Sequence, residues 1–359
     1  MTPTGAAPPP PPPPLLPCPL AAGWEVIGRG TLPRRHADGA PAGGYSAAAW
    51  QAEGDELWLL SDAPRGRLAG WRGLGTWPQR PLAPLGSTPL RGAAGLPLPA
   101  AIDGEGLVLL EGSAWVASEG RRTPARTPQL LRFSRRDGRL AAALPLPPAW
   151  RTAPGRGLAA NRGPESLALL RRAGRPPLLL LAAESPLLQD PPGGVRLLAW
   201  PVGNGPAPAS GEPATELRPL ALPVRGDWGL TDLLVVEEAG AAPALLGLWR
   251  SFEPPGRWQA RLVLYPLPGP ARAGEPPLPP RSGWNLLGLG VPADNWEAVA
   301  AGPPLADGRG TLVLVSDDNF SPLQENHLVR LAPRRAPGCR PLAAAATGAT
   351  GAGAGAADS

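Results

Sequence analysis

Acidic residues recur at the ends of apolar runs in this sequence, where they could bind cations or take part in proton transfer. The most complete example is residues 294–319, DNWEAVAAGPPLADGRGTLVLVSDDN, in which two apolar runs flank a polar turn. Glu297 stands at the start of the first run, and Asp317, Asp318 and Asn319 follow the second. Carboxylate and amide oxygens are the ligands that hard cations such as Ca²⁺ prefer.

The same pattern occurs at two earlier places in the chain. Residues 103–120 pair Glu105 with Glu119, and residues 161–185 pair Glu165 with Glu184, each time across two apolar runs. A hairpin returns the chain to the end of the sheet at which it began, so both acids of a copy are expected at one end. In a radial array of hairpins these ends point to one face, which predicts a ring of carboxylates on one rim.

Residues 43–64 form a fourth, degraded copy that ends in Asp62 and lacks the leading Glu. The predicted metal ligands are therefore Asp62, Glu105, Glu165, Glu297, Asp317, Asp318 and Asn319. The candidate catalytic residues are Glu297, Asp317 and Arg250, because a bound cation can activate water and an arginine can clamp an anion. Arg132 and Arg162 are further candidates for the clamp.

A purely structural interpretation of these acids stays open. An Asp or Glu just after a strand often caps a turn by accepting backbone N–H bonds. Isolated capping does not require the repetition, which favours a shared role in metal binding. His327 is interpreted as a residue on a strand face, and Ser46 is a weak candidate nucleophile because no partner histidine is evident in the sequence.

The elements that carry these residues are expected to be short strands. The 54 prolines and 47 glycines in 359 residues disfavour long helices. Apolar runs of strand length recur between turn residues, and no segment between them is long and periodic enough for a crossover helix. We expect an all-β fold, a single β-propeller with blades of ~45–52 residues and hence six or seven blades. The strand-like runs are residues 24–32, 55–62, 106–112, 113–120, 129–134, 166–171, 177–185, 195–202, 231–238, 244–252, 260–267, 298–302, 311–318 and 327–333.

Composition divides the chain into three parts. Residues 1–22 form a Pro-rich arm, residues 23–333 the propeller, and residues 334–359 an Ala/Gly tail, and both ends are expected to be disordered. Cys18 and Cys339 lie in these two ends. Their spacing fits neither a metal knuckle nor a redox pair, and a mutual disulfide stays open.

Several function classes are disfavoured by the residues present. The net charge is +5 and the sequence contains no lysine, but the arginines are scattered and form no stripe with aromatic residues, which argues against nucleic-acid binding. Two histidines exclude a histidine-rich zinc site, and neither a G-x-S-x-G elbow nor a phosphate-binding P-loop occurs. No apolar run approaches the ~20 residues of a transmembrane span, and the N-terminus is a poor secretory signal.

The acidic motifs resemble those of the phytase-like family, also called the esterase-like activity of phytase family. The matching segments are Asp103-Gly104-Glu105-Gly106-Leu107 with Trp115-Val116-Ala117-Ser118-Glu119, Asn161-Arg162-Gly163-Pro164-Glu165-Ser166-Leu167, and Asp294-Asn295-Trp296-Glu297-Ala298-Val299-Ala300 with Leu314-Val315-Ser316-Asp317-Asp318-Asn319-Phe320. The resemblance implies a β-propeller that hydrolyses phosphate esters with Ca²⁺ ions held by carboxylates. It also suggests an extracytoplasmic location.

The sequence departs from the family pattern at several positions. Ala63 and Trp249 stand where acids are expected, and Ser166 and Ala298 replace glycines that follow the Glu. These losses favour an alternative, a non-catalytic propeller that uses its acids for structural Ca²⁺ or for turn capping alone. A carboxylesterase is a third hypothesis, which the missing elbow and the scarcity of histidine disfavour. The substrate, the compartment and the oligomeric state stay open.

Overall fold

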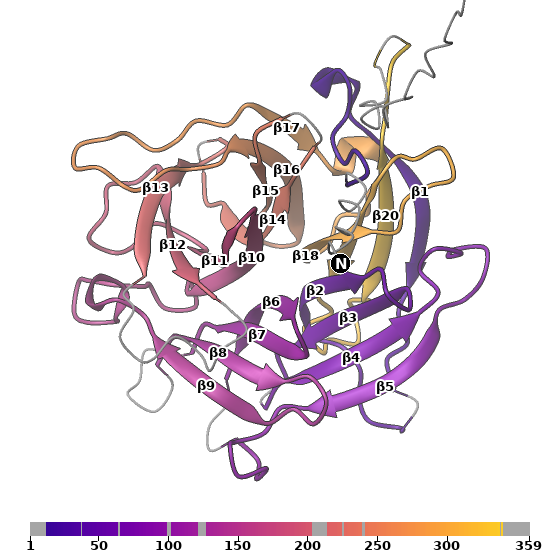
Figure 1. The fold of residues 1–359 in the computed structure, drawn as a ribbon, viewed down its shortest axis with the longest axis horizontal. Coiled ribbons are helices and arrows are strands. Elements are labelled where there is room, and N and C mark those ends of the chain that lie inside the picture. Colours follow the sequence, from indigo (N-terminus) through magenta and orange to yellow (C-terminus); the bar gives the residue numbers. More distant parts are fainter. Residues whose placement is uncertain are drawn as a thin grey trace, which may run out of the picture.

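The computed structural model describes residues 12–36, 38–63, 65–98, 102–120, 127–202, 214–224, 226–238, 241–337 and 339. These residues contain twenty β-strands and three short 3-10 helices. The strands form five four-stranded antiparallel sheets arranged around one axis, as the blades of a propeller (Figure 1). The all-β propeller is confirmed, but the prediction of six or seven blades is wrong because the structure has five.

Each blade runs outward from the axis in chain order. The first blade contains β2 (Tyr45–Gln51), β3 (Glu56–Ser61), β4 (Arg67–Arg72) and β5 (Ala83–Pro89). The second contains β6 (Gly104–Leu110), β7 (Ser113–Ser118), β8 (Gln129–Ser134) and β9 (Leu140–Pro145). The third contains β10 (Pro164–Arg172), β11 (Arg175–Ala183), β12 (Gly194–Pro201) and β13 (Thr215–Ala221). The fourth contains β14 (Gly229–Val236), β15 (Ala244–Glu253), β16 (Arg257–Pro266) and β17 (Ser282–Asn285).

The fifth blade joins the two ends of the chain. It contains β18 (Trp296–Gly302), β19 (Thr311–Ser316) and β20 (His327–Pro333), and β1 (Trp24–Thr31) pairs antiparallel with β20 as its outermost strand. The short helices are η1 (Leu20–Ala22), η2 (Pro148–Trp150) and η3 (Leu287–Leu289). None of the helices in the described residues has the length and apolar character that crossing a membrane requires.

The hydrophobic core is divided into five clusters, one between each pair of neighbouring blades. Large aromatic side chains fill these interfaces: Trp115 and Trp200 lie between the second and third blades, Trp249 between the third and fourth, and Trp296 between the fourth and fifth. Aromatic rings bury large areas of apolar surface, so these contacts hold neighbouring blades together.

The blade count was overestimated because the outer strands leave little trace in the sequence. β5 reads APLGSTP and is exposed or half-buried throughout, and β17 is only four residues long. Such strands carry neither the alternation nor the apolar runs on which strand prediction depends. The inner positions Ser46, Glu105 and Glu165 recur about every 60 residues, and dividing the body by this longer repeat leads to five blades.

Both predicted end segments are partly described by the structure. Leu15 of the Pro-rich arm is buried against the core of the fourth and fifth blades, and its side chain lies at Gly310. Trp284 Nε1 donates a hydrogen bond to the Leu20 carbonyl, and Cys18 forms a disulfide with Cys339. Residues 1–11 and 340–359 lie outside the described residues, so the predicted disorder there stays a prediction.

Candidate functional site

Every inner strand carries a β-bulge near the end at which it begins. The ladder skips one residue in each of the five strands, and the skipped residues are Ser46, Glu105, Glu165, Thr231 and Glu297. A bulge re-aims a side chain and locally increases strand twist, and bulges are over-represented next to functional sites. The five residues therefore occupy equivalent places around the axis, and we call these places the bulge positions.

A second set of equivalent residues lies at the end of the second strand of each blade. The Asp62, Glu119 and Asp317 amides each donate to a carbonyl just before the neighbouring inner strand, and Glu184 and Arg250 hold the matching places. We call these places the strand-end positions. The sequence prediction that Glu105, Glu165 and Glu297 share a hairpin end with Glu119, Glu184 and Asp317 agrees with the register.

Nine carboxylates gather at this end of the axis, which we call the acidic site. Its members are Asp62, Asp103, Glu105, Glu119, Glu165, Glu184, Glu297, Asp317 and Asp318, and each interacts electrostatically with at least one other member. The charge of Glu297 in the fifth blade reaches Glu105 in the second. The acids of different blades thus form one electrostatic unit, as the repeat predicted.

Burial and mutual repulsion favour the protonated forms of these acids. Burial, followed by the charges of Asp103, Glu297 and Asp318, raises the pKa of Asp62 to about 7. Burial also raises the pKa of Glu105, where Asp62 adds repulsion, and of Asp317 for the same two reasons. Taking a carboxylate out of water and placing it near like charges both disfavour ionisation. The acidic site is therefore short of positive charge.

Arg250 supplies the main positive charge inside the site. Its guanidinium lies 2.8 Å from Glu297 Oε1 and 3.9 Å from Glu184 Oε1, and its side chain is 20% exposed. Burial opposes the charge of Arg250, but Glu297, Glu184 and Glu165 outweigh burial and raise its pKa. Arg250 thus occupies a strand-end position that is acidic in the other four blades.

The two other predicted clamp arginines differ in position. Arg162 lies at the edge of the site, where its Nε is 3.5 Å from Glu184 Oε2 and its Nη2 is 2.9 Å from Asp227. Arg132 stacks over the Trp115 ring in the third strand of the second blade, with 5.7 Å from the guanidinium carbon to the ring centroid. Arg162 can reach an anion at the site, whereas Arg132 stacks on a tryptophan that is buried between the second and third blades.

Asp318 is used for capping. Its Oδ1 accepts hydrogen bonds from the Gly44 and Phe320 amides at 2.9 and 3.1 Å, and Asn326 Nδ2 donates to its Oδ2 at 3.0 Å. Asp317 Oδ1 accepts the Asn319 amide at 2.7 Å. The structural interpretation left open for these acids therefore accounts for the contacts of Asp318.

The two hydroxyl residues at bulge positions join neighbouring blades. Ser46 Oγ donates to the Gly104 carbonyl at 2.5 Å, and Thr231 Oγ1 donates to the Trp296 carbonyl at 3.1 Å. Each accepting carbonyl directly precedes a bulge glutamate of the next blade. Ser46 is thus engaged in a tie between blades, which gives no support to its role as a nucleophile.

The buried oxygens of the site show how well it would fit a metal ion. Within the described residues, Asp62 Oδ1, Asn295 Oδ1 and Glu297 Oε2 are buried and have no hydrogen-bond partner. Unpaired buried oxygens are costly, and hard oxygen donors are what Ca²⁺ requires. In the same part of the chain, no group of three or more His, Cys, Asp or Glu side chains is close enough to hold one ion. The donors fit a hard cation by chemistry, without forming a closed cage.

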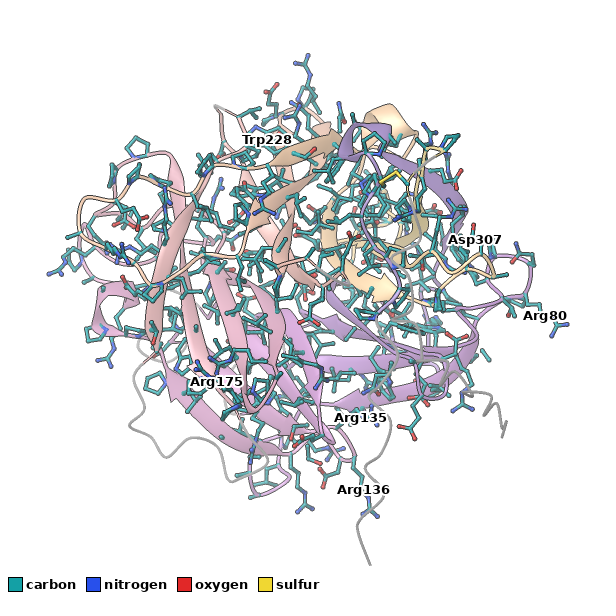
Figure 2. All side chains as sticks on the ribbon, turned by 45° about the horizontal axis from the view of Figure 1, so that its top comes forward. Arg80, Arg135, Arg136, Arg175, Trp228 and Asp307 are labelled. Atoms are coloured by element: carbon teal, nitrogen blue, oxygen red, sulfur yellow. A yellow bond between two sulfur atoms is a disulfide. The ribbon has the colours of Figure 1, made fainter. Side chains whose placement is uncertain are left out.

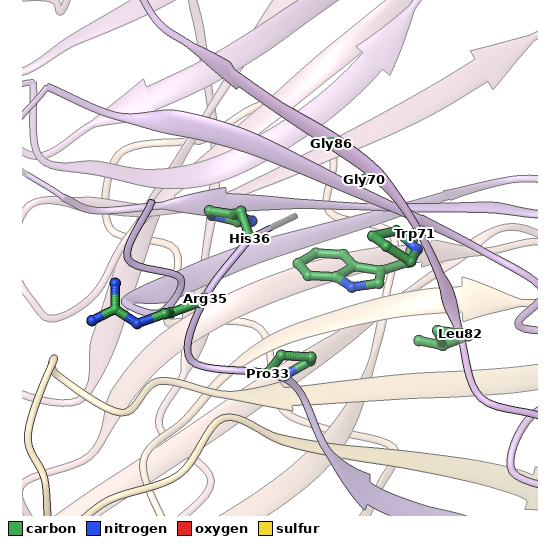
Figure 3. A pocket seen from close by; sticks show the side chains of 8 residues that line it. Pro33, Arg35, His36, Gly70, Trp71, Leu82 and Gly86 are labelled. Carbon is green, nitrogen blue, oxygen red and sulfur yellow. The ribbon is translucent and has the colours of Figure 1, made fainter. Parts of the chain in front are cut away.

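Two cavities lie outside the acidic site. One, of about 250 Å³, runs between the inner strands and is lined by aliphatic residues such as Leu107, Leu167 and Val299. The other, of about 160 Å³, lies on the outer strands of the first blade between His36, Trp71 and Pro33 (Figure 3). Neither cavity contains a bulge or strand-end residue, so neither belongs to the acidic site.

Sequence reasoning found much of the acidic site but missed some members. The sequence did not reveal Thr231 as a bulge residue or Arg250 as a strand-end residue, because the fourth blade has no acid at either position. Glu119, Glu184 and Asp103 were recognised in the motifs but not assigned as ligands. The repeat itself was the signal that could have included them. Arg34 also approaches the site, with its Nη1 3.9 Å from Asp318 Oδ2, whereas Arg80 and Arg136 point outward at the edge of the molecule (Figure 2).

Comparisons with known proteins extend this description. No curated protein matches the chain in sequence. Among solved structures, a mutant of the Cellvibrio cellulosa alpha-L-arabinanase aligns with a TM-score of 0.47 and 12% identity over 80% of this chain and 91% of its own. An exo-1,5-alpha-L-arabinanase from a bovine ruminal metagenomic library has a TM-score of 0.41 and 13% identity over 81% and 92%. These similarities are too distant to indicate an activity.

A third solved structure is more distant still. Raptor from Chaetomium thermophilum aligns with a TM-score of 0.36 and 8% identity over 86% of this chain and 29% of its own. A sequence model of one family, in contrast, matches residues 40–320, which include the acidic site and most of the propeller. That family is described as Phytase-like, with the esterase-like activity of phytase, and the chain belongs to it.

Proposed function

We propose that the protein hydrolyses phosphate monoesters at the acidic site with the help of a bound divalent cation, Ca²⁺ in the first instance. The observation that carries this proposal is the excess of negative charge: nine carboxylates gather at one end of the axis with Arg250 among them, and three buried oxygens of this site have no hydrogen-bond partner. Membership of the phytase-like family supports the same class of reaction.

The residues that would hold the cation are the unpaired donors Asp62, Asn295 and Glu297, together with Asp317 and Glu105. When bound, a divalent cation would neutralise the acids and polarise a phosphate oxygen. Asp318 and Asn319, which were predicted as ligands, are assigned to the support of the loop after β19. The oxygens of Asp318 already accept two backbone amides and the Asn326 side chain, whereas Asp62 and Glu297 each keep an unpaired oxygen that a cation could use.

Arg250 and Arg162 would orient the phosphate. Both side chains are partly exposed, at 20% and 29%, so an anion can reach them from solvent. A guanidinium presents paired donors that match the oxygens of a phosphate. Arg250 is already held by Glu297 and Glu184, so its position is fixed before the substrate binds.

Proton transfer is assigned to carboxyl groups of the acidic site that do not hold the cation, such as Glu165. In the proposed reaction the oxygen of a water molecule forms a bond to phosphorus while the bond from phosphorus to the ester oxygen breaks. A proton from the water passes to a carboxylate, and the departing alcohol oxygen takes a proton from a protonated carboxyl. Burial, followed by the charge of Glu184, raises the pKa of Glu165, so that this carboxyl keeps a proton more readily than an exposed acid.

The test is phosphate release from a monoester in millimolar Ca²⁺. We expect Glu297→Gln, Asp317→Asn and Arg250→Lys each to lower kcat/KM by about 10²-fold or more, because each removes a group at the reacting phosphate. Asp137→Asn, which changes an exposed acid in the turn before β9, is the matched control. Equal turnover by the wild type and the Glu297→Gln/Asp317→Asn double variant would refute the proposal.

A second candidate function is a non-catalytic propeller whose acids only stabilise loops. The contacts of Asp318 with Gly44, Phe320 and Asn326 favour it, because they are complete without a cation. It predicts equal melting temperatures in EDTA and in Ca²⁺, since a ligand that binds only the native state would raise the midpoint. A rise with Ca²⁺ that the Glu297→Gln variant lacks would exclude capping as the sole role.

A further inference from the structure

Two of the three phenylalanines in the chain are exposed, and both lie just after a strand-end position. Phe252 is 40% exposed and follows Arg250 by two residues, and Phe320 is 46% exposed and follows Asp317 by three. The third, Phe133, is fully buried. Both rings are therefore exposed near the acidic site, where apolar surface can take part in binding a ligand.

The first phenylalanine stands on a hairpin that extends beyond the acidic site. β15 and β16 remain paired past Arg250, so that Phe252 lies opposite Trp258 with ring centroids 4.4 Å apart. The Arg250 guanidinium carbon is 5.8 Å from the Trp258 ring centroid. The proposed phosphate clamp and the aromatic pair are therefore in direct contact.

The second phenylalanine is held in an unfavourable backbone conformation. Asn319 and Phe320 have φ of 49° and 51°. These values lie in the left-handed region, which residues other than glycine, Asn and Asp rarely adopt. The two preceding carboxylates stabilise this turn, since Asp317 accepts the Asn319 amide and Asp318 accepts the Phe320 amide. Strained residues of this kind cluster at ligand-binding sites.

The strained turn places the Phe320 ring beside Asp62. A methyl group added to Gly44 would clash with both the ring of Phe320 and Oδ1 of Asp62, so the two side chains lie against the same backbone atom. The ring is nevertheless not part of any hydrophobic core cluster. An exposed ring next to a proposed cation ligand has a geometry suited to contact with a bound substrate.

We propose that Phe252, Trp258 and Phe320, which we call the aromatic rim, bind the organic part of the ester. The substrates would then be phosphate monoesters of aromatic or other apolar alcohols. This inference rests on the proposed function and adds the substrate class.

The experiment compares 2-phenylethyl phosphate with ethyl phosphate in Ca²⁺. The two alcohols are similar leaving groups, so a difference in kcat/KM reports contacts with the phenyl ring rather than intrinsic reactivity. We expect the wild type to prefer 2-phenylethyl phosphate about tenfold. Phe252→Ala and Phe320→Ala should each reduce this preference about threefold, through KM.

The matched control is Leu85→Ala, which removes a 36% exposed apolar side chain from β5, the outermost strand of the first blade. It should leave the preference unchanged. No preference in the wild type, or an unchanged preference in the Phe252→Ala/Phe320→Ala double variant, would contradict the proposed role of the aromatic rim in substrate binding.

The outcome is decisive even if neither ester is hydrolysed. In that case the proposed function fails, and calorimetric titration with 2-phenylethylphosphonate and ethylphosphonate tests the rim separately. Tighter binding of the phenylethyl compound, lost in the double variant, supports the rim. Equal or absent binding of the two compounds overturns it.

Discussion

At the scale of single residues, the acidic site is defined by two sets of five equivalent positions. Four strand-end positions hold acids and the fifth holds Arg250, while three bulge positions hold glutamates and two hold hydroxyl residues. The hydroxyl residues Ser46 and Thr231 avoid adding further buried charge and tie neighbouring blades together. The charge of Arg250 and the two neutral hydroxyl groups thus limit the free-energy cost of burying a ring of carboxylates.

The raised pKa of Asp62 predicts a pH dependence of stability. Its pKa is about 7 in the folded protein against an ordinary value of 3.8, so the folded state binds this proton more tightly than the unfolded state. The stability from this group is therefore complete below about pH 4 and is lost as the pH rises through 7. We expect the melting temperature in EDTA to fall by about 5 °C between pH 5 and pH 8.

Two comparisons test this assignment to Asp62. Asp62→Asn should flatten the decline, because an amide cannot ionise, and Asp137→Asn should not, because the pKa of Asp137 is lowered. Ca²⁺ should raise the midpoint more at pH 8 than at pH 5, since it competes with protons for the same oxygens. A melting temperature that rises between pH 5 and pH 8 in EDTA would contradict the sign of this prediction.

At the scale of elements, the loop after β19 shows how the site is supported. Two left-handed residues in succession are stabilised by the side chains of Asp317 and Asp318, which lie at the end of a fully buried strand. We expect Phe320→Gly to be more stable than Phe320→Ala by about 1 kcal/mol, because glycine adopts φ of 51° without steric cost. Thermal melts of the two variants measure the difference.

The control for this prediction lies in the same loop. Leu323 is 93% exposed and is not among the residues with positive φ, so Leu323→Gly should be less stable than Leu323→Ala. If Phe320→Gly also proved less stable than Phe320→Ala, the turn would not be strained.

How far the sequence predicted this molecule also depends on its elements. Inner hairpins such as β18 and β19 are apolar and end in acids, so both the strands and the common location of Glu297 and Asp317 could be predicted. Outer strands such as β5 and β17 are exposed, short or rich in Pro and Gly, so the period of the repeat was not visible. The β-bulges could not be predicted at all, because an extra residue in one strand is defined only by the register of its partner.

At the scale of the whole molecule, the ring of blades is closed by elements from both ends of the chain. β1 completes the fifth blade by pairing with β20, and the segment before it packs on the fourth and fifth blades. β1 is held to β20 by strand pairing and packing rather than by a covalent bond. Separation of β1 from β20 would therefore expose the core of the fifth blade. The acidic site collects residues from all five blades and therefore depends on this closure.

The disulfide between Cys18 and Cys339 reinforces the closure, because it joins the segment before β1 to the segment after β20. The loop that it closes spans 321 residues, and cross-links over long loops remove the most conformational freedom from the unfolded chain. We expect reduction to lower the free energy of unfolding by about 2–5 kcal/mol and to lower the melting temperature accordingly. The Cys18→Ser/Cys339→Ser double variant should melt at the temperature of the reduced protein and should not respond to reductant. An unchanged midpoint of the wild type after complete reduction, verified by thiol titration, would show that β1 closes the ring without help from the disulfide.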